Sequence, residues 1–267
     1  MSIAARSGGQ FVKSFAAYAA ARWNPQCRHD RAIFVLGHAR SGSTALSNVL
    51  CSHRQISGFG ESHVTYDNKT ALGRLVVRQI GRRAWKPNAH YIFDKILYDE
   101  YDRSVSKDFF KSHGVFLVRE PGDSIRSILN LLIKAGRANS ENHLSISHYY
   151  EERLKHLIVM WNNFSAQNRV GLSFSELTDD SEKIVSLVSD KLALNPPLKN
   201  AYSAPAKSIR RGEGDPFLAH AYNRIMGPDR ASTIAVGTDD LDIAPQRMEA
   251  LQLLYRETVA LFRADRT

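Results

Sequence analysis

The sequence is poor in cysteine and has no long apolar run. Its 267 residues include two cysteines, Cys27 and Cys51, which provide no disulfide framework. A reducing compartment is therefore the expected environment, and we predict a cytoplasmic protein. No apolar run is long enough to cross a bilayer. The sequence therefore excludes a disulfide-stapled scaffold and a bilayer-spanning helix.

The N-terminal region lacks the form of a signal peptide. Its apolar residues over 11–21 are interrupted by Lys13, whereas a signal peptide places its charge before an unbroken apolar core. We predict instead an amphipathic helix over residues 10–22 that packs on the domain. Peripheral membrane contact through this helix stays open as an alternative.

Acidic residues are fewer than basic ones. The chain has 27 Asp and Glu against 36 Lys and Arg, a formal charge of +9. Such a charge attracts anions, including nucleic acids, acidic lipids, acidic sugars and polyphosphorylated cofactors. We find no nucleic-acid-binding module or aromatic platform, and His143 and His148 lack the spacing of a metal-binding motif. We therefore expect neither nucleic acid nor a metal as a partner.

Residues 31–50 have the pattern of a strand, a glycine-bounded turn and a helix. The apolar run at 32–36 is typical of a strand buried on both faces, and the residues from Ser43 onward place apolar side chains on one helical face. Backbone N–H groups in such a turn converge at the positive end of the helix. The pattern therefore predicts an anion site, most often a phosphate site.

The turn lacks the lysine of a nucleotide-binding loop. Gly37, Gly42 and Thr44 match the pattern G-x-x-x-x-G-K-[ST], but Ser43 occupies the lysine position. Because that lysine reaches the β- and γ-phosphates of a nucleoside triphosphate, its absence argues against ordinary ATP or GTP hydrolysis. Arg40 supplies a cation earlier in the loop.

The segment from His38 to Thr44 resembles the loop by which sulfotransferases hold the 5′-phosphosulfate of 3′-phosphoadenosine-5′-phosphosulfate (PAPS). That family has [KR]-[ST]-G-[ST]-[ST] at this point. The resemblance implies that five residues hold the phosphosulfate: Arg40, Ser41, Gly42, Ser43 and Thr44.

A second motif follows the apolar run at 114–118, which predicts another buried strand. Arg119, Pro121 and Ser127 have the spacing of the family's 3′-phosphate motif, R-x-P-x-x-x-x-x-S. Arginine offers a planar fork of donors suited to phosphate oxygens, and proline fits the first turn of a helix. The resemblance implies that Arg119 and Ser127 bind the 3′-phosphate.

Three candidate catalytic residues follow predicted strands. Glu61 comes after a strand predicted over residues 55–60, and Lys95 ends one predicted over 90–95. The segment Gly60-Glu61-Ser62-His63 is similar to a Glu-Glu-Thr-Arg segment of tyrosylprotein sulfotransferases, which implies that Glu61 is the base. His63 is the alternative base, because imidazole titrates near neutrality. Lys95 is a candidate for stabilising the leaving oxygen.

A third cofactor contact is implied further along the chain. Arg210, Arg211 and Gly212 are similar to an Arg-Lys-Gly segment that cytosolic sulfotransferases place against the 3′-phosphate. A surface loop without a ligand is the alternative interpretation.

The alternation of strand and helix patterns predicts an α/β fold in three layers. A central parallel sheet would contain the phosphate loop's strand, with helices on both faces. We predict one domain, 1–267, with an N-terminal helical extension (1–28), a cofactor-binding core (31–215) and C-terminal helices (216–267). Further predicted elements are helices over 67–85, 145–167, 179–192 and 246–262 and a strand over 169–174.

The resemblance implies that the protein is a PAPS-dependent sulfotransferase. It would move the sulfuryl group to an acceptor hydroxyl by direct displacement and release 3′,5′-adenosine bisphosphate (PAP) without a metal. We expect a small-molecule or glycan acceptor, and favour a glycan or glycolipid; the residues do not indicate an oligomeric state. The alternatives are an atypical phosphate-loop kinase that uses ATP with magnesium, and a basic nucleic-acid-binding domain.

Overall fold

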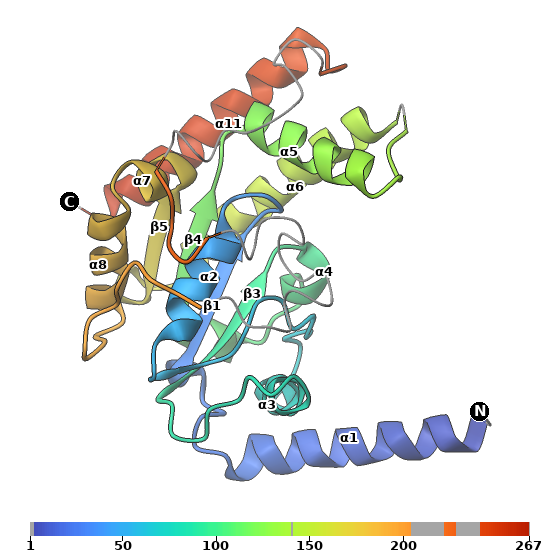
Figure 1. The fold of residues 1–267 in the computed structure, drawn as a ribbon. Helices are drawn as coiled ribbons and strands as arrows, with labels where there is room; N and C mark the ends of the chain where they lie inside the picture. The colour runs from blue at the N-terminus through green and yellow to red at the C-terminus, as the bar shows by residue number, and fades with distance from the viewer. Residues whose placement is uncertain (1–2, 140, 204–221, 228–240, 267) are drawn as a thin grey trace.

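A five-stranded parallel sheet forms the centre of the computed structural model, which describes residues 3–139, 141–203, 222–227 and 241–266 (Figure 1). Its strand order is β2-β3-β1-β4-β5. The strands are β1 (Ala32–Gly37), β2 (Ile56–Ser57), β3 (Tyr91–Ile96), β4 (His113–Val118) and β5 (Arg169–Ser173).

Helices cover both faces of the sheet (Figure 1). The described helices are α1 (Ile3–Trp23), α2 (Ser43–Ser52), α3 (Ala71–Gly81), α4 (Asp99–Asp102), α5 (Pro121–Lys134), α6 (Asn142–Asn163), α7 (Phe174–Asp179), α8 (Ser181–Lys191) and α11 (Pro245–Ala264). On one face lie α3, α5, α6 and α11, and on the other lie α2, α7 and α8.

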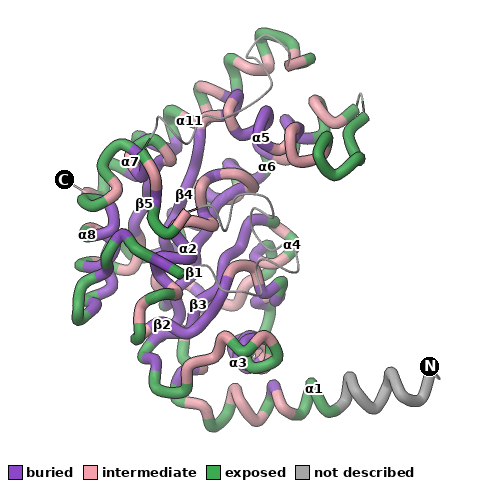
Figure 2. Tube along the Cα trace, in the orientation of Figure 1, coloured by how far each residue is buried: buried purple, intermediate pink, exposed green. Residues whose placement is uncertain are grey.

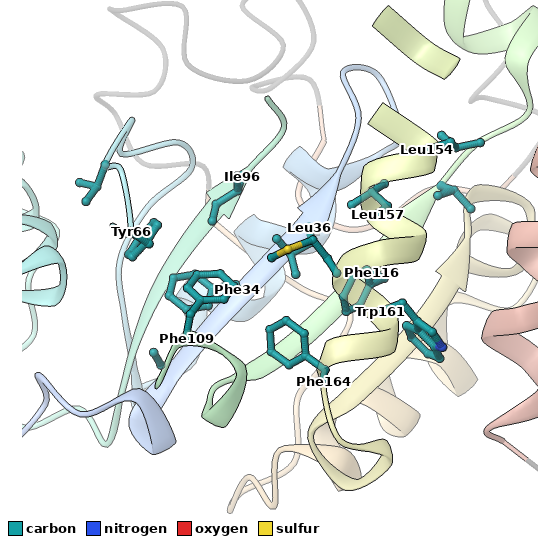
Figure 3. Close-up of a cluster of buried hydrophobic side chains, with 14 of the residues drawn as sticks. Phe34, Leu36, Tyr66, Ile96, Phe109, Phe116, Leu154, Leu157, Trp161 and Phe164 are labelled. Carbon is teal, nitrogen blue, oxygen red and sulfur yellow. The ribbon is translucent and has the colours of Figure 1, made fainter. Parts of the chain in front are cut away.

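Alternate residues of each strand enter two separate cores, because successive side chains of a strand point to opposite faces. In β1, Phe34 and Leu36 join the larger core with Phe116 of β4 and Trp161 of α6, and Figure 3 labels all four side chains. Ile33 and Val35 belong to the second core, against α2 and α8. Burial on both faces explains the continuous apolar runs of the central strands.

The strand order reverses at β1. The chain runs from β1 outward through β2 and back to β3, and then crosses to β4 on the other side of β1, where Gly37 pairs with Leu117. Ligands of open parallel sheets bind beyond the carboxyl ends of the strands at such a reversal. The loops after β1 and β4 meet at this point.

The predicted α/β fold, with a central parallel sheet and helices on both faces, is confirmed. Several boundaries differ from the predicted ones. β2 ends at Ser57 instead of Gly60, because Gly58 has a φ of 154° and packs so closely on Phe93 that a Cβ would lie 2.8 Å from its carbonyl oxygen. α1 begins at Ile3, earlier than predicted, and α3 is shorter than the predicted 67–85.

Candidate functional site

The loop between β1 and α2 turns through two left-handed residues, Arg40 (φ 66°) and Gly42 (φ 89°). A Cβ on Gly42 would lie 2.6 Å from the ring of Phe174, so this position requires glycine for space as well as for conformation. α2 begins at Ser43, immediately after this turn, and directs the positive end of its dipole toward the loop. The local structure is therefore that of a phosphate-binding turn.

His38 ties this loop to the loop after β4. Its Nε2 accepts a hydrogen bond of 2.9 Å from the backbone N–H of Arg119, and its Nδ1 lies 2.9 Å from the carbonyl oxygen of Ala39. Burial lowers the pKa of His38 to about 4, so the ring is neutral near pH 7 and keeps its acceptor nitrogen. The two motifs of the sequence are thus joined directly.

Arg119 is held by an aromatic ring and a carboxylate. Its guanidinium lies over the ring of Phe174, 4.1 Å from the centroid, and its Nη2 is 3.2 Å from a carboxylate oxygen of Asp123. Burial lowers the pKa of Arg119, Asp123 opposes that effect, and the positive charge of Arg40 reinforces it. Phe174 therefore supports both Gly42 and Arg119, a junction that the sequence did not predict.

The predicted 5′- and 3′-phosphate residues also meet through their side chains. Arg40 Nε donates a hydrogen bond of 2.8 Å to Ser127 Oγ on α5. On the same helix, Arg126 contacts the second oxygen of Asp123 at 3.1 Å. Arg40, Arg119 and Arg126 thus lie around the loop and the start of α5, where Asp123 contacts two of them and Glu120 is the second nearby carboxylate. Basic side chains therefore outnumber carboxylates there.

Glu61, His63 and Lys95, hereafter the Glu61 cluster, lie together at the ends of β2 and β3. Lys95 Nζ is 3.2 Å from Glu61 Oε1, and His63 Nε2 is 3.5 Å from Glu61 Oε2. The same Lys95 Nζ donates to Thr44 Oγ1 at 3.2 Å. The Lys95 side chain is 1% exposed and that of Glu61 is 13% exposed. One buried lysine therefore connects the candidate base to the phosphate loop.

The cluster holds Glu61 in its ionised form. Burial alone would raise the pKa of Glu61, but the contacts with His63 and Lys95 outweigh burial and lower it below its usual value. The same contact raises the pKa of His63. The contact thus favours a protonated His63 and an ionised Glu61.

Asp94 fixes the backbone that carries the cluster. Its Oδ1 accepts from the backbone N–H groups of Ser62 and Lys95 at 2.8 and 2.9 Å, and its Oδ2 accepts from the hydroxyl of Tyr66 at 2.6 Å. Burial raises the pKa of Asp94 to about 6. Because Ser62 lies between Glu61 and His63, Asp94 positions both of them.

Two tyrosines adjoin the cluster and the loop. Tyr149 accepts from the Ala39 N–H and donates to the Leu97 carbonyl, both at 2.8 Å. The ring of Tyr98 lies 5.6 Å from that of Tyr149, and Tyr98 is 41% exposed. Burial raises the pKa of Tyr98, and the negative charge of Glu61 adds to this. An accessible aromatic ring thus lies near the candidate base.

Arg153 is a second residue that sequence analysis missed. It is fully buried on α6, where its Nε donates to the Gly37 carbonyl at 2.8 Å and its Nη2 to the Ile96 carbonyl at 3.0 Å. Its guanidinium also pairs with both carboxylate oxygens of Asp102. Arg153 therefore fastens the ends of β1 and β3, from which the loop and Lys95 extend. In the sequence, Arg153 lies within the helix predicted over 145–167, and nothing in that pattern indicated this role.

Two further groups of residues bear on the expected third cofactor contact and on metal binding. Arg210, Arg211 and Gly212 lie outside the described residues. Asp99, Asp102 and His156 lie close enough together to offer three metal ligands. Arg153, however, already contacts Asp99 Oδ1 and both oxygens of Asp102. This group is therefore an ion-pair cluster around an arginine.

The residues of the loop region fit an anionic cofactor. Ser41 Oγ, Arg119 Nε and Arg126 Nε are buried and have no hydrogen-bond partner within the part of the chain that the structure describes. A buried polar group without a partner is costly, and phosphate oxygens would satisfy all three. The turn, the α2 N-terminus and the arginines have the chemistry that a nucleotide bisphosphate requires.

Comparisons with known proteins agree with this geometry. The sequence model of the sulfotransferase family matches residues 32–112, which include the loop after β1 and the Glu61 cluster. A search of curated protein sequences gives no match.

Three solved structures have a similar fold. The sulfotransferase domain of the Synechococcus PCC 7002 olefin synthase has a TM-score of 0.57 at 14% identity, covering 87% of this chain and 97% of that one. Mouse sulfotransferase SULT7A1 complexed with PAP has 0.52 at 11%, covering 95% and 92%. Sulfotransferase STF9 from Mycobacterium avium has 0.50 at 13%, covering 92% and 81%. The chain therefore has the fold of these sulfotransferases.

Proposed function

We propose that this protein is a sulfotransferase that uses PAPS and an acceptor hydroxyl, with Glu61 as the base. The observation that carries the proposal is the position of the phosphate loop. On one side the loop contacts Lys95 through Thr44, and on the other it contacts Ser127 through Arg40. A candidate base and a candidate 3′-phosphate site therefore lie on either side of one anion-binding turn.

The residues around the loop would divide the cofactor between them. Arg40 to Thr44 would hold the 5′-phosphosulfate, and Arg119 with Ser127 would hold the 3′-phosphate. PAPS would supply a sulfuryl group on an oxygen bridge to phosphate, and that bridging oxygen would keep the bond's electron pair in the released PAP. The position of the Arg119 guanidinium over Phe174 and its buried Nε without a hydrogen-bond partner in the described part of the chain support this role.

Glu61 would take the acceptor's proton as the acceptor oxygen bonds to sulfur. Its lowered pKa keeps it ionised and ready to accept a hydrogen bond. Lys95 would balance the negative charge that grows on the leaving oxygen, since its ammonium lies within 3.2 Å of Thr44 in the loop. His63 would orient Glu61 through the contact at 3.5 Å.

The acceptor is proposed to be a glycan or glycolipid hydroxyl. The partly exposed ring of Tyr98, packed against Tyr149 and close to Glu61, supports an acceptor with a face that can lie on an aromatic ring. A panel of sugars, glycolipids, phenols and steroids, each incubated with sulfur-labelled PAPS, would test this. Labelled sugar products are expected; labelled phenols alone would contradict the acceptor class.

The catalytic assignment is tested by Glu61→Gln. We expect turnover to fall by about 100-fold or more, because the amide cannot accept the proton, while PAP affinity stays nearly unchanged. Glu152→Gln, an exposed glutamate on α6, serves as the matched control. If Glu61→Gln keeps its turnover, Glu61 is not the base. If the protein transfers phosphate from ATP with magnesium and no sulfate from PAPS, the sulfotransferase proposal fails.

A further inference from the structure

Helix α1 buries small residues and exposes large ones. Ala17, 3% exposed, lies against Gly73 of α3 so closely that a Cβ on Gly73 would overlap the Ala17 carbonyl oxygen. Val12, Phe15, Tyr18 and Trp23 are 57–71% exposed. Burying a large apolar side chain typically gains about 1.5–3 kcal/mol, so a helix selected only to cover α3 would turn these residues inward.

The four exposed residues form one surface, here called the α1 outer face (Val12, Phe15, Tyr18 and Trp23). At 100° per residue all four lie within one side of the helix, opposite Ala17. They are four of the ten most exposed large apolar residues in the described part of the chain, and the others are spread over several elements. Figure 2 shows the exposed positions along the described side of α1, and Figure 1 shows that α1 extends beyond the rest of the molecule. A flat surface can therefore reach this face.

The charges of α1 itself have one sign. The sequence of α1 contains Arg6, Lys13 and Arg22 and no acidic residue. Lys13 and Arg22 are exposed.

These charges favour one of the possible binding partners of the α1 outer face. A second copy of the chain docked through the same face would bring two acid-free basic helices together, which is electrostatically unfavourable. An anionic lipid surface complements both the charge and the apolar residues. Tryptophan and tyrosine, both present in the outer face, favour the boundary between headgroups and acyl chains.

We propose that the α1 outer face docks on an anionic lipid bilayer, with α1 lying in the plane of the headgroups. No described helix is both long and apolar enough to cross a membrane, so the contact would be peripheral. The apolar side chains would enter the headgroup region, while the exposed Lys13 and Arg22 of α1 would meet lipid phosphates.

The test is sedimentation of the full chain with vesicles. We expect binding to phosphatidylcholine vesicles that contain phosphatidylglycerol, weak binding to phosphatidylcholine alone, and loss of binding as salt rises. The double variant Phe15→Ser/Trp23→Ser should bind at least about tenfold more weakly, since two apolar anchors are removed. Val159→Ser/Leu253→Ser, which changes equally exposed residues on α6 and α11, should bind as the unaltered protein does.

Three outcomes would overturn the proposal. In the first, the unaltered protein does not bind anionic vesicles. In the second, the Val159/Leu253 control loses binding as strongly as the Phe15/Trp23 variant, and in the third, sedimentation velocity shows a dimer that becomes a monomer in the Phe15/Trp23 variant. The last result would assign the face to a second copy. PAP binding by the Phe15/Trp23 variant should be unchanged, because the substitutions lie outside the candidate site, so the result is independent of the proposed function.

Discussion

Glu61 combines a carboxylate with two cationic partners on different elements. Lys95 comes from β3, and His63 comes from the loop that also carries Glu61. Each was a candidate from the sequence because each follows a strand. Their mutual contact could not be predicted, since it depends on β2 pairing with β3 and on the buried carboxylate of Asp94 holding the Ser62 backbone.

The effect of the two basic partners on the pKa of Glu61 can be tested by replacing one of them. The proposed role of Glu61 as the base requires its ionised form, and its pKa is held below its usual value partly by His63. In His63→Gln that stabilisation is lost, the Glu61 pKa rises, and activity should disappear at a higher pH on acidification. The measurement is the acid limb of kcat/KM against pH, with the exposed His90→Gln as control.

Either of two results would contradict this assignment. If His63→Gln abolishes turnover at every pH while Glu61→Gln does not, His63 is the base. If the acid limb stays where it is in the unaltered protein, His63 does not influence Glu61.

Among the elements, the strand–loop–helix at β1 and α2 was the most predictable. Gly37 and Gly42 marked its turn, and the structure gives each a steric reason: a Cβ would lie 2.7 Å from the Leu117 carbonyl oxygen at Gly37 and would strike Phe174 at Gly42. β2 was the least predictable, because its two residues carry little periodic signal. Sequence analysis missed Arg153 for a different reason: its hydrogen bonds to backbone carbonyls at the ends of β1 and β3 leave no pattern in the sequence.

Arg153 should be essential for holding α6 against the ends of β1 and β3. Arg153→Met removes the buried guanidinium that pairs with Asp102 and leaves that carboxylate with His156 Nε2 at 2.9 Å. Breaking a buried ion pair in this way costs about 3–5 kcal/mol of unfolding free energy. Urea unfolding measures the loss, with Arg256→Met on the exposed side of α11 as control. A loss of under about 1 kcal/mol, comparable to a surface change, would show that Asp102 does not depend on Arg153.

For the molecule as a whole, the sequence indicated the fold class and both candidate cofactor motifs but not how the motifs lie relative to each other. The motifs are far apart in the chain, and they meet because β4 pairs with β1 and His38 bonds to the backbone of Arg119. Strand order is set by long-range packing, which local periodicity does not report. The same limit applies to α1: its amphipathic pattern was evident, but the sequence did not show that its small residues face α3.

The most direct test of the account is calorimetric titration with PAP, alongside ATP with magnesium and 5′-AMP. We predict metal-independent binding of PAP, with Arg119→Ala weakening it by about 10- to 150-fold through loss of charge-assisted hydrogen bonds, and Arg256→Ala leaving it unchanged. Arg119→Lys, which keeps the charge but not the fork, guards against a folding defect. Binding of ATP with magnesium in place of PAP, or PAP binding indifferent to both Arg119 variants, would contradict the account.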